Sequence, residues 1–192
     1  MLDNFRKYLE GKFLLTDHDF ELISKHCLIN KLHKKQYLLR AGDLWNRHAF
    51  ISKGFLKMFC VGENGQEHIL QFAPENYWTG DRESVTTGLP AKYNIDAIEQ
   101  SEVVLMTNEH FEMLRKAIPA FNEFVIDTIN KNVFALQERI HVNITSTAEE
   151  KYINFIRQFP DIANRVPLHM IASYLGTSAE TLSRIRSQSV KK

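Results

Sequence analysis

Residues 168–188, which read LHMIASYLGTSAETLSRIRSQ, combine a regular apolar pattern with side chains that can form hydrogen bonds to nucleic acid. Arg184 carries the planar fork that pairs with a guanine edge, and Glu180 can accept a hydrogen bond from cytosine. Ser183 can bond to a base or to a phosphate. These residue types therefore indicate recognition by hydrogen bonding, in which no covalent bond is made or broken.

The apolar pattern around Gly176 predicts two short helices joined by a tight turn. A glycine can end a helix in the left-handed conformation that other residues resist. The residues one, four, five and eight positions before it form one helical stripe: Leu175, Ala172, Ile171 and Leu168. Thr177, followed three residues later by Glu180, has the form of a capping box that starts the second helix. The apolar face of that helix is Leu182 and Ile185, and the small Ala172 lets it approach closely, as in a helix-turn-helix.

A helix-turn-helix inserts the N-terminal half of its second helix into the major groove of DNA. We expect base contacts from the residues that point away from the apolar face: Ala179, Glu180, Ser183, Arg184 and Ser187. Phosphate contacts are expected from the flanking polar and basic residues: Thr177, Ser178, Arg186, Lys191 and Lys192. An ordinary helical hairpin remains the alternative, in which Glu180 only caps the helix and Arg184 is a solvated charge.

The charge distribution agrees with DNA binding. Residues 164–192 carry a net charge of +4, whereas the whole chain carries only +1. Positive charge is therefore concentrated where phosphates would be met. The patch is weak for a monomer that binds DNA, and two copies would supply more charge.

Length and composition predict two domains and a cytoplasmic location. A chain of 192 residues with 44% hydrophobic content can bury one good core and a small second one. It contains no apolar run of the length that spans a membrane, and its start lacks the apolar segment of a secretory signal. Cys27 and Cys60 are isolated, without the spacing of a metal site, and are expected to be reduced packing residues.

The first part of the chain predicts two helices followed by a small β domain. The first 27 residues have helical patterning, with a helix start at Thr16 and Asp19. From 29 to 107 the chain breaks into short runs of β-forming residues separated by glycines. Residues 49–59 and 61–72 are interpreted as two strands joined by a hairpin turn, and the regular spacing favours a jelly roll or barrel.

Helical periodicity returns before Pro119 and then continues to about residue 144, which predicts a helix about 40 Å long. Its apolar residues recur every three or four positions: Val125, Ile129, Val133, Leu136 and Ile140. Such a helix is longer than a small barrel needs, so a second copy could cover its exposed stripe in a twofold coiled coil. Packing on its own barrel is the alternative. Residues 147–159 predict one further helix.

The order of these parts resembles the Crp/Fnr family of bacterial transcription regulators across nearly the whole chain. The matching motifs are LRAGD at 39–43, FISKGFLKMF at 50–59, Gly80-Asp81 and LGTSAETLSRI at 175–185. The resemblance implies an α+β fold. It places a cyclic-nucleotide-binding-like jelly roll with flanking helices at 1–118, a long dimerisation helix at 119–145 and a helix-turn-helix domain at 146–192, with the β-hairpin wing missing or minimal.

The ligand motif departs from the family pattern. Cyclic-nucleotide-binding members use a Gly-Glu pair for the ribose and, about ten residues later, an arginine followed by Ser or Thr for the phosphate. This chain has Gly80-Asp81 and then PAKYN at 90–94, so the arginine is absent. Cyclic AMP is therefore not the expected effector, because its phosphate would lose its charge-assisted hydrogen bonds. No cofactor is predicted, and any unidentified small-molecule effector is expected near Gly80, Asp81, Arg82, Lys92 and Tyr93.

The reading helix also departs at one position. Ala179 stands where cyclic-AMP-responsive relatives carry a base-reading arginine, whereas Glu180 and Arg184 match. The resemblance implies a homodimer that binds an inverted-repeat operator in double-stranded DNA, with RNA polymerase as a further candidate partner and no membrane partner.

Two other classes of protein are alternatives to a DNA-binding regulator. An enzyme with a cupin-type barrel needs clustered metal ligands, but His48 and His68 stand apart and no His-x-His occurs. Neither an enzyme nor a metal site is therefore predicted. The alternative that remains is a ligand-sensing or protein-interaction signalling module of the same fold that does not itself bind DNA.

Overall fold

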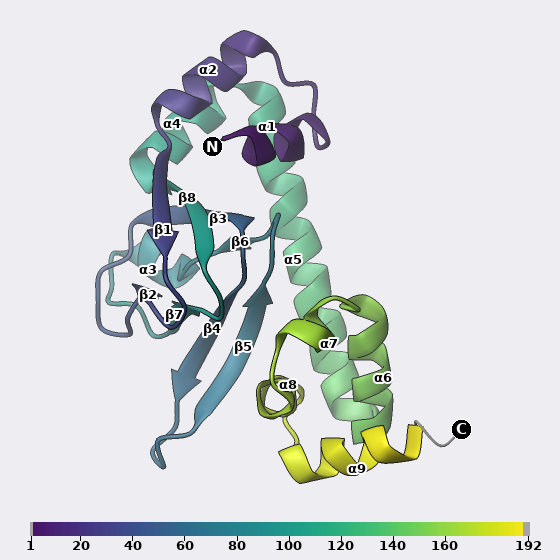
Figure 1. The fold of residues 1–192 in the computed structure, drawn as a ribbon. Helices are drawn as coiled ribbons and strands as arrows, with labels where there is room; N and C mark the ends of the chain where they lie inside the picture. Colours follow the sequence, from purple (N-terminus) through teal and green to yellow (C-terminus); the bar gives the residue numbers. More distant parts are fainter. Residues whose placement is uncertain (1, 190–192) are drawn as a thin grey trace. The chain divides into compact units, whose positions relative to one another are not determined.

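The computed structural model describes residues 2–189, apart from the side chains of Ala163 and Ser189. The chain divides into two compact units (Figure 1). The first contains the chain up to Cys60 together with Gln71–Asn130, and the second contains Val61–Leu70 together with the chain from Lys131 onward. The units do not follow chain order, because the hairpin tip and the second half of the long helix both belong to the second unit.

Two four-stranded sheets form the β domain within the described residues. The first sheet has the spatial order β1 (Leu28–Leu32), β8 (Ser101–Thr107), β3 (Arg47–Lys53) and β6 (Trp78–Thr79). The second has the order β2 (Tyr37–Leu39), β7 (Asn94–Ala97), β4 (Leu56–Val61) and β5 (Glu67–Ala73). Alternate residues of both sheets, such as Ile51 and Ile95, are buried in one apolar cluster between them. The predicted roll of short antiparallel strands is confirmed.

One predicted strand is wrong. Residues 49–59 form parts of β3 and β4, which lie in different sheets and are separated by a turn at Gly54. The φ of Gly54 is +91°, and a Cβ there would lie 2.6 Å from the carbonyl oxygen of Gln100. The run of β-forming residues concealed this turn because its only local signal is one glycine, and the crowding comes from Gln100 and Ser101, far along the chain.

Gly54→Ala is expected to lower the free energy of unfolding by roughly 3 kcal/mol or more, because the added methyl group combines backbone strain with steric overlap. Gly65→Ala is the matched control, since Gly65 has a φ of +78° and no atom within 4 Å of its Cβ position. Only the left-handed strain of about 1–2 kcal/mol applies there. Urea unfolding of both variants measures the difference, and equal losses would contradict the crowding argument.

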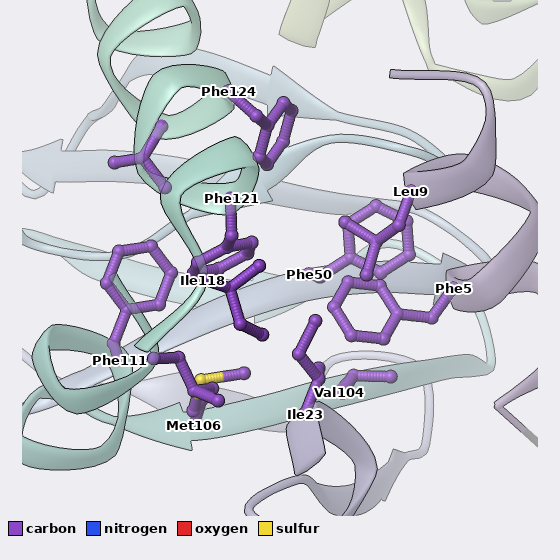
Figure 2. Packing of buried hydrophobic residues seen from close by; sticks show 12 residues of the cluster. Phe5, Leu9, Ile23, Phe50, Val104, Met106, Phe111, Ile118, Phe121 and Phe124 are labelled. Atoms are coloured by element: carbon purple, nitrogen blue, oxygen red, sulfur yellow. The ribbon is translucent and has the colours of Figure 1, made fainter. Parts of the chain in front are cut away.

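Four helices cover the outer face of the first sheet: α1 (Asp3–Glu10), α2 (Asp17–Lys25), α4 (Asn108–Ala117) and the start of α5 (Pro119–Thr145). Figure 2 shows their apolar side chains meeting outward-facing residues of β3 and β8. The ring centroids of Phe5 and Phe50 are 4.8 Å apart. The predicted start of α2 is confirmed, because Thr16 and Asp19 form a reciprocal capping box. The short α3 (Arg82–Thr87) lies between β6 and β7 in the chain.

The second unit is mainly helical. It contains the C-terminal half of α5 and four further helices: α6 (Ala148–Gln158), α7 (Ile162–Arg165), α8 (Leu168–Leu175) and α9 (Ala179–Ser189). The predicted long helix is confirmed, since α5 has 27 residues and begins at Pro119, where a missing N–H costs nothing. Over residues 2–189, the structure contains no helix that is both long and apolar enough to cross a membrane.

Candidate nucleic-acid interface

The turn between α8 and α9 depends on Gly176. This residue ends α8 with φ +65° and ψ +37°, the left-handed conformation predicted for it. The Thr177 N–H donates to the Ala172 carbonyl at 3.0 Å, and the Gly176 N–H donates to the Ser173 carbonyl at 3.2 Å. This pair of bonds is the Schellman arrangement, which satisfies the last carbonyls of a helix and turns the chain sharply.

The start of α9 differs from its prediction by one residue. The N-cap is Ser178 rather than Thr177, because the Ser178 hydroxyl accepts a hydrogen bond from the Thr181 N–H at 3.1 Å. The expected capping box between Thr177 and Glu180 is therefore wrong. Thr177 and Ser178 both carry a hydroxyl that could cap the helix, so the sequence alone does not distinguish them. The length of the turn after Gly176 decides which of the two becomes the N-cap.

The apolar faces of α8 and α9 form the interior of this small domain. The predicted stripe is buried at Ile171, Ala172 and Leu175, and the facing residues Leu182 and Ile185 are also buried. Phe155 of α6 is buried as well, and α6 packs against both helices. The two short helices are therefore held by a shared core, as a helix-turn-helix requires.

The opposite face of α9 is exposed and polar. Four of the five predicted base-contacting residues are exposed, namely Glu180, Ser183, Arg184 and Ser187, and Ala179 is half-buried. Among the predicted phosphate contacts, Ser178 and Arg186 are exposed and Thr177 is half-buried, whereas Lys191 and Lys192 lie outside the described residues. Hydrogen bonds from the Glu180 amide and the Ser178 hydroxyl lower the pKa of Glu180, so its carboxylate is ionised at neutral pH.

In the β domain, the residues of the expected ligand pocket bond to one another. Asp81 is only 2% exposed, and its carboxylate accepts hydrogen bonds from the N–H groups of Ser84 at 3.0 Å and Lys92 at 2.9 Å. Gly80 lies against Trp45, whose ring nitrogen would be 2.7 Å from a Cβ at that position. A buried carboxylate therefore accepts hydrogen bonds from two backbone amides at the expected ligand site.

The basic residues expected at this pocket lie at the surface. Lys92 is exposed, and its amino group forms an ion pair with Glu83 at 2.7 Å, which raises the pKa of Lys92. Arg82 is also exposed, on α3, and Tyr93 is half-buried. These residues do not fit the cyclic phosphate of a nucleotide, because the Lys92 amino group is paired with Glu83 and the Arg82 side chain is exposed to solvent.

The His48 side chain packs against neighbouring residues. Its ring stacks on Phe111 with the centroids 3.8 Å apart, and Nε2 lies 3.0 Å from the Asn108 side-chain oxygen. Burial lowers the pKa of His48 and favours the neutral ring. Among residues 2–189, no group of three or more His, Cys, Asp or Glu side chains is placed to hold a metal ion.

The apolar residues of α5 separate into two groups. Val125 is buried in the core cluster of its own unit, and Ile129 packs against that cluster. Val133, Leu136 and Ile140 are 45%, 57% and 59% exposed, and Phe134 and Ile144 are more exposed still. Ile126 is also 45% exposed, but most of the exposed apolar surface of this helix lies C-terminal to Ile129, in the second unit.

Two polar residues of the second unit make contacts that the sequence did not indicate. Ser173 of α8 forms hydrogen bonds to the backbone of β5, and Arg139 of α5 donates to the carbonyls of Leu70 and Tyr174. No local signal could have found them, because Ser173 and Ile69 are 104 positions apart in the chain.

Comparison with known proteins agrees with this arrangement. The cyclic nucleotide-binding domain family matches residues 29–117. The transcriptional activator protein Anr of Pseudomonas protegens is 25% identical over 165 residues, covering 80% of this chain and 67% of Anr. The cAMP-activated global transcriptional regulator CRP of Salmonella typhimurium is 22% identical over 181 residues, covering 88% of this chain and 86% of CRP. Along most of its length the chain is therefore similar to Crp/Fnr-type transcriptional regulators.

Solved structures show that this chain shares its fold with distantly similar proteins. FixK2 from Bradyrhizobium japonicum superposes with a TM-score of 0.73 at 15% identity, over 84% of this chain and 83% of FixK2. The shared fold includes the β roll, the long helix and the C-terminal helices.

Proposed function

We propose that this protein is a homodimeric, sequence-specific DNA-binding transcription regulator of the Crp/Fnr type. One observation carries the proposal: the exposed polar face of α9 stands on a helix-turn-helix whose apolar faces are fully packed. Arg184 and Glu180 on that face have complementary base partners in guanine and cytosine. The relatives that align along most of the chain are transcriptional regulators rather than enzymes, which supports the same conclusion.

The stripe of Val133, Leu136 and Ile140 supports a dimer. Apolar side chains at this spacing, exposed on one helix, are the pattern by which two copies form a coiled coil. A twofold dimer also sets two recognition helices about one DNA turn apart. Its two copies together carry twice the weak positive charge of one DNA-binding domain. The operator is then an inverted repeat, the working location is the cytoplasm, and RNA polymerase is the expected further partner.

The decisive experiment is selection of bound sites from random duplex DNA, followed by sedimentation of the complex to count subunits. Recovery of an inverted repeat bound by two chains is the expected result. A folded chain that enriches no sequence, and whose affinity for duplex DNA does not fall with salt, would instead be a signalling module without a DNA target.

The bonding of Asp81 leads to a separate prediction about cyclic nucleotides. Millimolar cyclic AMP or cyclic GMP is expected to leave the melting temperature unchanged, because residues 90–94 contain no arginine for the phosphate and the Lys92 amide already donates to Asp81. Thermal unfolding with and without nucleotide measures this, with AMP as the control for nonspecific effects. A rise of several degrees with a cyclic nucleotide alone would show that the residues around Asp81 rearrange to bind it.

A further inference from the structure

The free edge of β5 is bonded to a side chain of the helix-turn-helix. β5 is the last strand of its sheet, so within residues 2–189 one edge of its backbone has no neighbouring strand. The Ser173 hydroxyl of α8 donates to the Glu67 carbonyl at 2.8 Å and accepts from the Ile69 N–H at 3.0 Å. A single hydroxyl thus makes the two backbone hydrogen bonds that an adjacent strand would otherwise make with Glu67 and Ile69.

Arg139 adds a second connection at the same place. Its guanidinium donates to the Leu70 carbonyl of β5 and to the Tyr174 carbonyl of α8, the latter at 3.2 Å. The guanidinium carbon also lies over the Tyr174 ring, 4.1 Å from its centroid. Ser173, Arg139 and Tyr174, together with the backbone of 67–70, are called the latch below. The latch connects α5, β5 and α8, and every one of its residues lies in the second unit.

The latch leaves the helix-turn-helix itself undisturbed. It uses Ser173 and Tyr174 on α8, whereas Ile171, Ala172 and Leu175 form the buried stripe of the same helix. The reading face of α9 stays exposed while the latch is closed. The latch therefore controls where the helix pair stands relative to the hairpin, and it does not act by covering the base-reading residues.

The hairpin that the latch holds is acidic. Between Val61 and Leu70 the charged residues are Glu63 and Glu67, both exposed, and no Lys or Arg is present. The Glu67 backbone bonds directly to Ser173, so the closed latch keeps these carboxylates beside the helix pair. Charges separated by less than about 8–10 Å are only partly screened at physiological salt, so DNA phosphates approaching α8 and α9 are repelled.

We propose that the latch is an autoinhibitory contact that holds the helix-turn-helix beside an acidic hairpin and so weakens DNA binding until the contact opens. The inference rests on the proposed DNA-binding function. Opening requires that Ser173 and Arg139 exchange their hydrogen-bond partners on β5 for water, and each such bond contributes little net free energy. The closed state predominates, and the open state is a minor population that an effector, a partner or DNA itself can raise.

The test uses Ser173→Ala in the full chain. Hydrogen exchange at the Ile69 amide is expected to accelerate, because this N–H loses its acceptor. The affinity for the selected operator is expected to rise about fivefold, the factor by which loss of one ordinary hydrogen bond changes a population. Thr86→Ala is the control, since the Thr86 hydroxyl bonds only within its own helix in the first unit, and neither quantity should change.

Two further variants separate the contact from the charge. Glu67→Gln keeps the backbone carbonyl that Ser173 uses but removes a carboxylate, so affinity should rise without faster exchange at Ile69. Arg139→Gln removes the second connection and should repeat the effect of Ser173→Ala, with sedimentation checking that the dimer persists. Unchanged exchange in Ser173→Ala, or faster exchange with equal or lower DNA affinity, overturns the inference. Faster exchange in a chain that binds no duplex at all overturns the proposed function instead, and shows the latch to be a structural contact only.

Discussion

Replacing Leu136 by glutamate is expected to separate the two subunits and to weaken operator binding by at least about a hundredfold. Leu136 is 57% exposed within one chain, so the substitution leaves the monomer core intact. In a coiled coil the carboxylate would be buried against its symmetry mate, and burying an unpaired charge costs several kcal/mol. Sedimentation measures the loss of the dimer, and titration of the selected operator measures the loss of affinity.

Ala135→Glu is the control for this substitution. Ala135 is also exposed, but it points away from the stripe formed by Val133 and Ile140, because residues two apart on a helix lie on nearly opposite sides. This variant should remain dimeric and bind the operator nearly as well as the parent chain. If the Leu136→Glu protein remained dimeric, or bound equally well as a monomer, the interface would lie elsewhere.

Arg184→Ala is expected to abolish discrimination at one base pair in each half-site. A bidentate contact between an arginine and guanine contributes roughly 1–3 kcal/mol of discrimination, and a dimer loses this contact twice. Operator affinity should therefore fall roughly a hundredfold or more, whereas binding to unrelated duplex falls only slightly. Titration against operators with each of the four bases at the affected position measures the effect.

Arg186→Ala provides the comparison, because Arg186 is exposed on the same helix and is proposed to contact phosphate. Its loss should weaken binding to all sequences alike and reduce the slope of affinity against salt concentration. An unchanged sequence preference in the Arg184→Ala protein would remove Arg184 from the reading role and favour Glu180 or Ser183 as the residue that selects the operator.

The substitutions at Leu136, Arg184 and Ser173 affect different steps of DNA binding. Leu136 acts on assembly, Arg184 on sequence choice and Ser173 on the balance between two positions of the same helix pair. Ser173→Ala is the only one of these variants expected to raise affinity. A strengthened operator complex that keeps both its stoichiometry and its sequence preference would therefore be specific to the latch.

Local patterns in the sequence determined the elements of this protein. The stripe before Gly176, the periodicity after Pro119 and the capping pair Thr16 and Asp19 are short-range features, and α8, α5 and α2 form where these predict them. Hydrophobic periodicity and end signals act within one or two turns of a helix, so they can be recognised without knowing what packs against them. The exposed face of α9 follows from the same periodicity, because the apolar side of that helix defines its polar side.

Tertiary structure decided the features that depend on residues far apart in the chain. The division of residues 49–59 at Gly54 depends on crowding by Gln100 and Ser101. The bonding of Asp81 to Lys92 and of Ser173 to β5 depends on backbone groups brought together only by the fold. A sequence shows which side chains can donate or accept a hydrogen bond. The partner that each one finds is selected by the packing of the whole chain, because the free energy of a buried polar group depends on what surrounds it.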